Sequence, residues 1–117
     1  MNAAPFKPMA YLKEGCPFSF KFLLFLAETG LRDRFELIRC NPDAPEFEAI
    51  RSRLQAGLHK PATFPTVEVA PGRYMSDSDA LIAHYASSYG IEAARLPALS
   101  FYVQTIFPQL LQLHEGH

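Results

Sequence analysis

Cys16 is the residue of this chain that is best placed to do chemistry. The tetrapeptide CPFS at 16–19 follows a predicted strand at 9–12 and begins a predicted helix at 17–29. At a helix N-terminus the unpaired backbone N–H groups point toward the sulfur, and the helix dipole favours a thiolate over a thiol. Pro17 suits the first helical position, because its missing N–H would have no intrahelical partner there. We therefore predict a nucleophilic thiol; the alternative is a buried, inert cysteine.

Two residues near Cys16 bear on this chemistry. Ser19 stands where a dithiol motif would carry its second cysteine, so an intramolecular disulfide is excluded at this turn. That favours monothiol exchange through a mixed disulfide. Ser19 either hydrogen-bonds the thiolate or satisfies its own backbone. Lys13 either favours the thiolate as a nearby cation or is a solvated side chain at the end of the strand.

Length, charge and composition limit the function classes. The chain has 117 residues, 49% of them hydrophobic, which is enough for one globular domain and too few for two. A net charge of −1 and the lack of a long apolar run give no indication of a nucleic-acid or membrane partner. Two cysteines, Cys16 and Cys40, fit a reducing, cytoplasmic compartment. His84, His114 and His117 lack the spacing of metal ligands, so no metal is expected.

The remaining elements follow from apolar periodicity and from helix and strand breakers. The first helix ends before Gly30, and the sequence then predicts a strand at 35–39 and a helix at 45–56 that is followed by Gly57. Strands at 66–69 and 73–75 form a hairpin. A helix at 76–89 comes next, and Ser76 and Asp79 form a capping box at its start. The order βαβ followed by ββα predicts an α/β fold with a mixed four-stranded sheet. Cys40, at the end of the second strand, is expected to be a small core residue.

A different pattern follows Gly90. Apolar residues recur there at spacings of three and four, and aromatic residues widen this stripe; the residues are Leu96, Leu99, Val103, Ile106, Leu110 and Leu113, with Phe101, Tyr102 and Phe107. They predict one amphipathic helix, which Pro108 should kink. We divide the chain into a domain at 1–90 and a C-terminal helical extension at 91–117. The stripe either folds back on the domain or pairs with a second copy, and we expect a homodimer through this helix.

Three separated motifs occur in a fixed order: CPFS at 16–19, Phe64-Pro65-Thr66, and SDSDAL at 76–81. Together they resemble the thioredoxin-like N-terminal domain of the glutathione transferase superfamily, of the type with a catalytic cysteine, and more distantly the glutaredoxins. The resemblance covers about 9–90. The first motif is similar to the active-site tetrapeptide of the omega-like, dehydroascorbate reductase and intracellular chloride channel groups. The second is similar to the family's cis-proline element, and the third to the Glu-Ser-Asp-Ala-Ile segment that holds the γ-glutamyl end of glutathione.

The resemblance implies a thioredoxin-like fold and glutathione as co-substrate. Cys16 and Lys13 would do the chemistry, since a glutaredoxin often has lysine at this spacing. The residues implied to bind glutathione are Phe18, Lys60, Phe64, Pro65, Asp77 and Ser78. Without the resemblance, the Phe64–Pro65 bond would be expected to be trans, and Asp77 and Ser78 would be an ordinary helix cap. Asp77 is one methylene shorter than the glutamate of the family, which should loosen its contact with the ligand ammonium group.

The implied activity is that of a glutathione-dependent thiol transferase acting on a small disulfide or electrophile. Full-length members carry a second, all-helical domain, and the segment at 91–117 resembles the first helix of that domain. The resemblance therefore implies that most of the site for a hydrophobic second substrate is missing, whereas small-disulfide exchange needs less protein. The alternative function is a non-catalytic binding or dimerisation module.

Overall fold

The computed structural model describes residues 6–115. The outer ends of the two predicted domains, 1–5 and 116–117 with His117, lie outside the described residues. The elements are β1 (Met9–Lys13), α1 (Pro17–Thr29), β2 (Glu36–Cys40), α2 (Phe47–Leu58), β3 (Thr66–Ala70), β4 (Arg73–Ser76), α3 (Ser78–Tyr89), α4 (Pro97–Phe101), a π-helical turn (Tyr102–Ile106) and α5 (Phe107–Glu115), with short 3₁₀ turns at Leu31–Arg34 and Ala93–Arg95.

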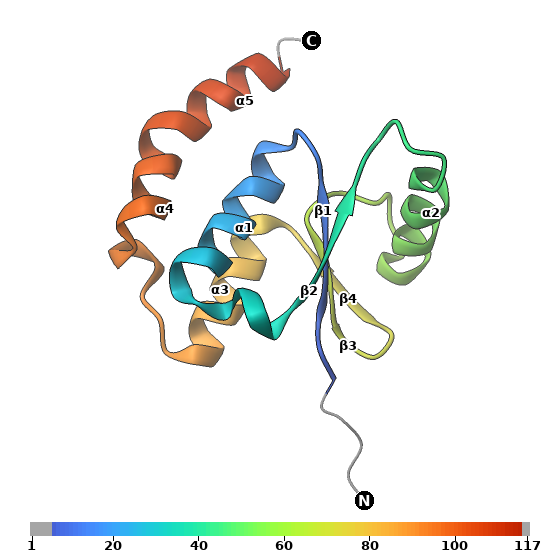
Figure 1. The fold of residues 1–117 in the computed structure, drawn as a ribbon, viewed down its shortest axis with the longest axis horizontal. Helices are drawn as coiled ribbons and strands as arrows, with labels where there is room; N and C mark the ends of the chain where they lie inside the picture. Colours follow the sequence, from blue (N-terminus) through green and yellow to red (C-terminus); the bar gives the residue numbers. More distant parts are fainter. Residues whose placement is uncertain (1–5, 116–117) are drawn as a thin grey trace, which may run out of the picture.

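The four strands form the mixed sheet that the sequence predicts. Their order is β2-β1-β3-β4. Strand β1 runs parallel to β2 and antiparallel to β3, which pairs antiparallel with β4. Helices α1 and α3 cover one face of the sheet and α2 covers the other, while the C-terminal helix, residues 97–115, lies beyond α1 (Figure 1). This is the α/β arrangement of a thioredoxin-like domain followed by a C-terminal helix.

Apolar side chains are buried on both faces of the sheet. The larger core lies under α1 and α3, and the smaller one, under α2, consists of Tyr11, Cys40 and Leu54 with partly buried neighbours. Successive residues of a strand point to opposite faces, so Ala10 and Leu12 join the larger core while Tyr11 joins the smaller one. Cys40 is 1% exposed, in agreement with its predicted place in the core.

Helix α2 begins and ends two residues later than predicted, and the prediction that Gly57 follows this helix is wrong. Gly57 lies in its last turn, where a Cβ atom would collide with the ring of Tyr74 on β4. The helix ends at His59, whose φ of 60° is left-handed. The glycine is therefore needed for the close approach of α2 to the sheet, and it does not serve as a helix stop.

The C-terminal helix folds back on α1, which is one of the two predicted alternatives. The carboxylate of Glu28 on α1 accepts hydrogen bonds from the N–H groups of Ala98 and Leu99 at 2.7 and 2.8 Å. These bonds satisfy two of the N–H groups that lack a partner in the first turn of a helix. The negative charge also lies at the end of the helix where the dipole favours it.

Pro108 produces a π turn directly before it, where the sequence predicts a kink. The N–H of Phe107 donates to the carbonyl of Tyr102, five residues back. Proline has no N–H for the usual bond four residues back, and the wider turn accommodates its ring. Tyr102 and Phe107 consequently share the buried face, at 3% and 8% exposed, whereas Ile106 is 42% exposed. Within the predicted stripe, the widening residues Tyr102 and Phe107 are therefore buried, whereas Val103, Ile106 and Leu113 are exposed.

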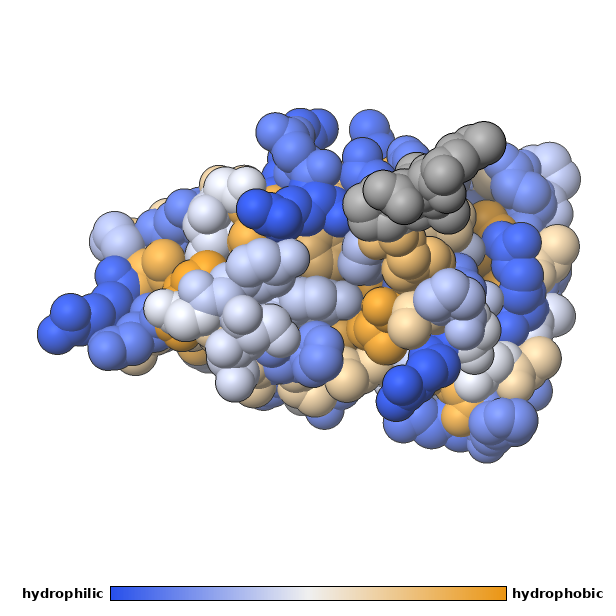
Figure 2. All heavy atoms as spheres, turned by 90° about the horizontal axis from the view of Figure 1, so that it is seen from below, coloured by the Kyte–Doolittle hydropathy of each residue, from blue (hydrophilic) through white to orange (hydrophobic). Residues whose placement is uncertain are grey.

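The surface carries apolar side chains in separate places. Figure 2 shows one face of the molecule, on which hydrophobic patches lie between hydrophilic side chains. The most exposed large apolar residues on the C-terminal helix are Phe101 and Leu113, at 63% and 65%. No helix within residues 6–115 has the length and apolar character that crossing a membrane requires.

Candidate functional site

Cys16 caps the N-terminus of α1. Its backbone is extended, with φ −99° and ψ 119°, and Pro17 occupies the first helical position as predicted. The first-turn N–H groups are predicted to face the sulfur; within the described chain the side chain makes no capping hydrogen bond to them. The thiol donates to the carbonyl oxygen of Phe64, with 3.8 Å between Sγ and O. Cys16 is half-buried, so its sulfur is not sealed in the interior.

The loop that precedes β3 places the backbone carbonyl of Phe64 beside the thiol. The Phe64–Pro65 peptide bond is cis, as the resemblance implies. The Phe64 ring stacks on Phe47 of α2, with 5.7 Å between ring centroids and 27° between planes. Pro65 is fully buried behind it. Packing from α2 therefore fixes the carbonyl that faces Cys16.

Asp77 and Ser78 lie where β4 passes into α3. The N-cap of α3 is Asp77, not Ser76, so the predicted capping box is wrong. One carboxylate oxygen of Asp77, Oδ1, accepts from the N–H groups of Asp79 and Ala80 at 2.9 and 3.5 Å. Ser76 instead ends β4 and pairs with Thr66. The sequence could not separate the two, because Ser and Asp are both favoured at N-caps.

The backbone of Asp77 is strained. Its φ is 83° and its ψ is 113°, a conformation that side chains with a Cβ atom rarely adopt. Such strain persists where the surrounding structure enforces it and is concentrated at functional sites. Ser78, the next residue, is 3% exposed although it lines a cavity.

A cavity of about 620 Å³ joins these segments, and we name it the polar cavity because charged and hydroxyl side chains contribute to its lining. It brings together every predicted site residue except Pro65, namely Lys13, Cys16, Phe18, Lys60, Phe64, Asp77 and Ser78. One of these residues, Lys60, is exposed to solvent. Cations, aromatic rings, a hydroxyl and a helix N-terminus thus surround the thiol, which suits a small ligand with charged ends and an extended backbone.

Two cationic or titratable residues of this cavity were missed from the sequence. Arg51 of α2 lines the wall and is bound to the carboxylate of Glu48 at 2.8 and 3.0 Å. His114 lines the cavity from α5. Arg51 lies four residues after Phe47 on α2, and both line this cavity, so the spacing was a usable signal. His114 gave none, since its place depends on how the C-terminal helix folds back.

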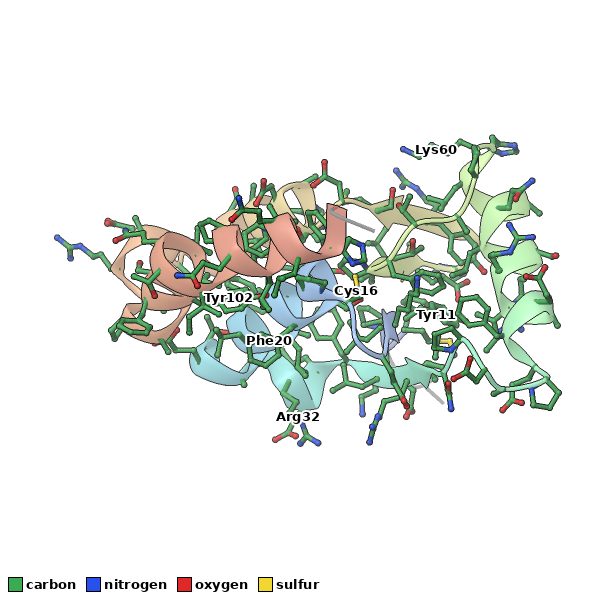
Figure 3. All side chains as sticks on the ribbon, turned by 90° about the horizontal axis from the view of Figure 1, so that it is seen from above. Tyr11, Cys16, Phe20, Arg32, Lys60 and Tyr102 are labelled. Carbon is green, nitrogen blue, oxygen red and sulfur yellow. The ribbon has the colours of Figure 1, made fainter. Side chains whose placement is uncertain are left out.

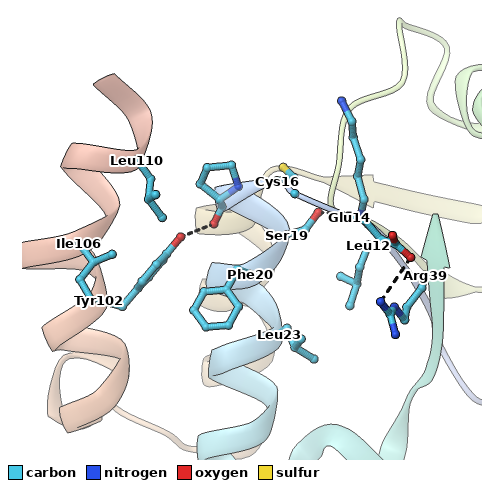
Figure 4. Close-up of a pocket in the computed structure, with 13 residues that line it drawn as sticks. Leu12, Glu14, Cys16, Ser19, Phe20, Leu23, Arg39, Tyr102, Ile106 and Leu110 are labelled. Atoms are coloured by element: carbon cyan, nitrogen blue, oxygen red, sulfur yellow. Dashed lines mark hydrogen bonds and ion pairs between the residues drawn. The ribbon is translucent and has the colours of Figure 1, made fainter. Parts of the chain in front are cut away.

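A second cavity, of about 680 Å³ and mostly apolar, begins on the other side of Cys16. Pro17, Phe20 and Leu23 of α1 form one wall, and Tyr102, Ile106 and Leu110 of the C-terminal helix form the opposite wall (Figure 4). In Figure 3, Cys16 lies between Tyr102 and Phe20 on one side and Lys60 on the other. The sequence predicts that most of a second-substrate site is missing, and the structure shows an apolar cavity beside the thiol all the same.

Tyr102 links the apolar cavity to the active-site turn. Its hydroxyl donates to the carbonyl oxygen of Pro17 at 2.7 Å, and its ring meets Phe20 edge-on at 5.0 Å. Burial, and secondarily the negative charge of Cys16, raises the pKa of Tyr102 above its ordinary value. The phenol therefore stays neutral beside the thiol and holds the C-terminal helix on the turn that carries it.

Ser19 and Lys13 are linked through the backbone. The Ser19 hydroxyl accepts a hydrogen bond from the Lys13 N–H at 3.0 Å and is buried. This bond ties the end of β1 to the first turn of α1, so the side chain of Ser19 stabilises the turn. The side chain of Lys13 lines both cavities. Among the described residues, no group of three or more His, Cys, Asp or Glu side chains is placed to hold a metal ion.

Comparison with known proteins agrees with this arrangement. The family model of the glutathione S-transferase N-terminal domain matches residues 15–88, which is more than half of the chain. A crystal structure of a possible glutathione S-transferase from Rhodopseudomonas palustris is similar, with a TM-score of 0.52 and 22% sequence identity. The match covers 75% of this chain and 42% of that one, and at this identity it concerns the fold alone. A comparison with curated proteins gave no significant match.

Proposed function

Because this chain belongs to the family of glutathione S-transferase N-terminal domains, we propose that it is a glutathione-dependent thiol transferase whose nucleophile is Cys16. One observation carries the proposal: the sulfur lies 3.8 Å from the Phe64 carbonyl oxygen, in a cavity that Ser78 and Lys60 also line. The chain spans less than half the length of the solved relative, so its activity is argued from its own site.

The proposed reaction is two thiol–disulfide exchanges. The Cys16 thiolate attacks the glutathionyl sulfur of a mixed disulfide, so that a Cys16–glutathione disulfide forms and the other thiolate leaves and takes up a proton. A second glutathione, as thiolate, then attacks the bound glutathionyl sulfur. Glutathione disulfide leaves and the Cys16 thiolate is regenerated. The tetrapeptide holds no second cysteine, which keeps the reaction monothiol.

The polar cavity would bind glutathione. The N-terminus of α3 with the Ser78 hydroxyl suits the carboxylate at the γ-glutamyl end. The Asp77 carboxylate, one oxygen of which caps the helix, suits the neighbouring ammonium group. The backbone of Phe64 would form hydrogen bonds with the central peptide of glutathione. The ammonium group of Lys60 or Lys13 would bind the glycyl carboxylate. The apolar cavity would hold the other half of the disulfide, or an electrophile.

The test is reduction of a glutathione mixed disulfide by the Cys16→Ser variant. We expect the activity to be lost, because the serine hydroxyl does not form a disulfide. Cys40→Ala is the matched control, since Cys40 is buried in the smaller core and lines neither cavity in the described part of the chain. Full activity in Cys16→Ser would refute the mechanism.

The exchange assay of the wild-type chain, together with calorimetry, decides the alternative function, which is a non-catalytic binding or dimerisation module. If the wild-type chain shows no exchange activity and calorimetry shows no binding of glutathione, the module is the better account. Binding without exchange would leave a glutathione-binding module and would exclude the transferase.

We further propose that two copies pair through the outward face of the C-terminal helix. Phe101 and Leu113 remain 63% and 65% exposed there after the helix has folded back on α1. Light scattering tests this pairing. A mass of one chain, 13.1 kDa, at every dilution would contradict it.

A further inference from the structure

Lys21 is a lysine buried in the interior of the domain. It lies in the middle of α1 and is 4% exposed, whereas lysine is almost never fully buried unless it is paired. Its ammonium nitrogen lies 2.8 Å from Oδ1 of Asp79, whose side chain is 83% exposed. Only the lysine of this pair has been withdrawn from water, so the carboxylate is what stabilises its charge.

Asp79 connects Lys21 to the residues of the polar cavity. It is the second residue of α3, directly after Ser78, and its backbone N–H donates to the Asp77 carboxylate at 2.9 Å. The ion pair therefore holds the side chain of Asp79 from inside the domain, while Asp77 holds its backbone from the cavity side. The strained Asp77 backbone, with φ 83°, lies within this arrangement.

Two aromatic rings complete the surroundings of the ammonium group. Its nitrogen lies 4.3 Å from the ring centroid of Phe107 and 5.8 Å from that of Phe18. The two rings meet edge-on at 5.2 Å. A cation over aromatic faces is stabilised without water. Phe18 lines the polar cavity and Phe107 belongs to the C-terminal helix, so Lys21 joins α1, α3 and α5 at one point.

We propose that Lys21 is a positioning residue for glutathione: through Asp79 it fixes Asp77 and Ser78 relative to the Cys16 thiol. This inference rests on the proposed function. Within residues 6–115, Lys21 lines neither of the two cavities, so it acts through Asp79 and does not contact the ligand. Its loss should weaken glutathione binding and spare the reactivity of the sulfur.

The test compares Lys21→Met with Lys21→Arg. Methionine keeps the length and volume of the side chain without the charge, and arginine keeps the charge. We expect Lys21→Met to raise the KM for glutathione on the order of tenfold, because the ligand must then order Asp77 and Ser78 as it binds, with kcat changed much less. Lys21→Arg should restore most of the affinity. The rate of Cys16 alkylation by iodoacetamide without glutathione should be the same in all three proteins.

The outcomes separate the inference from the function on which it rests. If the wild-type chain does not bind glutathione, the proposed function fails. If the wild-type chain binds glutathione, two results for Lys21→Met would refute the positioning role. One is an unchanged affinity for glutathione, and the other is a kcat that falls by the same factor as the KM rises. Should Lys21→Met fail to fold, Asp79→Asn gives the same comparison from an exposed position, and an unchanged KM there would refute the role.

Discussion

The two cavities that meet at Cys16 differ in their walls and in the part of the chain that builds them. The polar cavity is lined by the end of β1, the start of α1, α2, the loop before β3 and the start of α3, and α5 adds His114. The apolar cavity depends on the C-terminal helix for one complete wall. One sulfur thus faces a polar cavity to which the C-terminal helix adds His114, and an apolar cavity for which that helix supplies a whole wall. The difference predicts that the two sites can be damaged separately.

Ser78→Ala should have the largest effect, confined to the polar cavity. Ser78 is 3% exposed and lies at the N-terminus of α3. Removing a hydroxyl that bonds a charged ligand group should weaken glutathione binding by about 10- to 100-fold. Calorimetry measures this, with Ser88→Ala at the other end of α3 as the matched control. Unchanged affinity in Ser78→Ala would remove this residue from the binding site.

Ile106→Glu should affect only the apolar cavity. Ile106 is 42% exposed, so a carboxylate there leaves the fold intact while charging the wall opposite Phe20. We expect kcat/KM for the glutathione mixed disulfide of an aromatic thiol to fall about tenfold, because the charge opposes an apolar ligand. The mixed disulfide of a small polar thiol should react as before. Gln112→Glu, on the same helix, adds the same charge away from the cavity and controls for it. An equal loss for both disulfides would show that the two cavities are not separate sites.

The smallest effect concerns Tyr102, which lines the apolar cavity and is bonded to the turn that carries Cys16. Its pKa is raised above 10.0, first by burial and then by the charge of Cys16. The folded chain therefore holds this proton more tightly than the unfolded chain. This contribution to stability is present below about pH 10 and is lost as the pH rises through the folded-state pKa. In Cys16→Ser the pKa of Tyr102 should be lower than in the wild type but still above 10.0. NMR titration of the tyrosine ring carbons measures it, and an identical pKa in both proteins would contradict the contact.

The sequence predicts the polar cavity far better than the apolar one, for a physical reason. The residues at 16–19, 64–66 and 76–81 lie at the ends of helices and strands, where local backbone preferences position side chains. Short sequence motifs are therefore enough to predict these site residues. The cap at Asp77 was missed because neighbouring Ser and Asp residues satisfy the same preference.

The apolar cavity depends instead on where a helix packs, which a linear pattern does not give. Pro108 indicates a break, but a linear pattern does not show that the resulting π turn places Tyr102 and Phe107 together against Phe20 and Phe18 of α1. A regular helix would have buried Ile106. The burial of Lys21 could not be predicted from the sequence either, because its partners, Asp79 and Phe107, lie on α3 and α5.

The most direct test of the account is to locate the glutathione adduct after the native chain has reacted with glutathione disulfide. Both cysteines are free, but Cys16 lies between the two cavities, whereas Cys40 is 1% exposed and its pKa is raised by burial. Peptide mass spectrometry should therefore find one glutathione on Cys16 and an unmodified Cys40. A native chain that carries the adduct on Cys40, or none on Cys16, would contradict the claim that the sulfur at the start of α1 is the reacting atom.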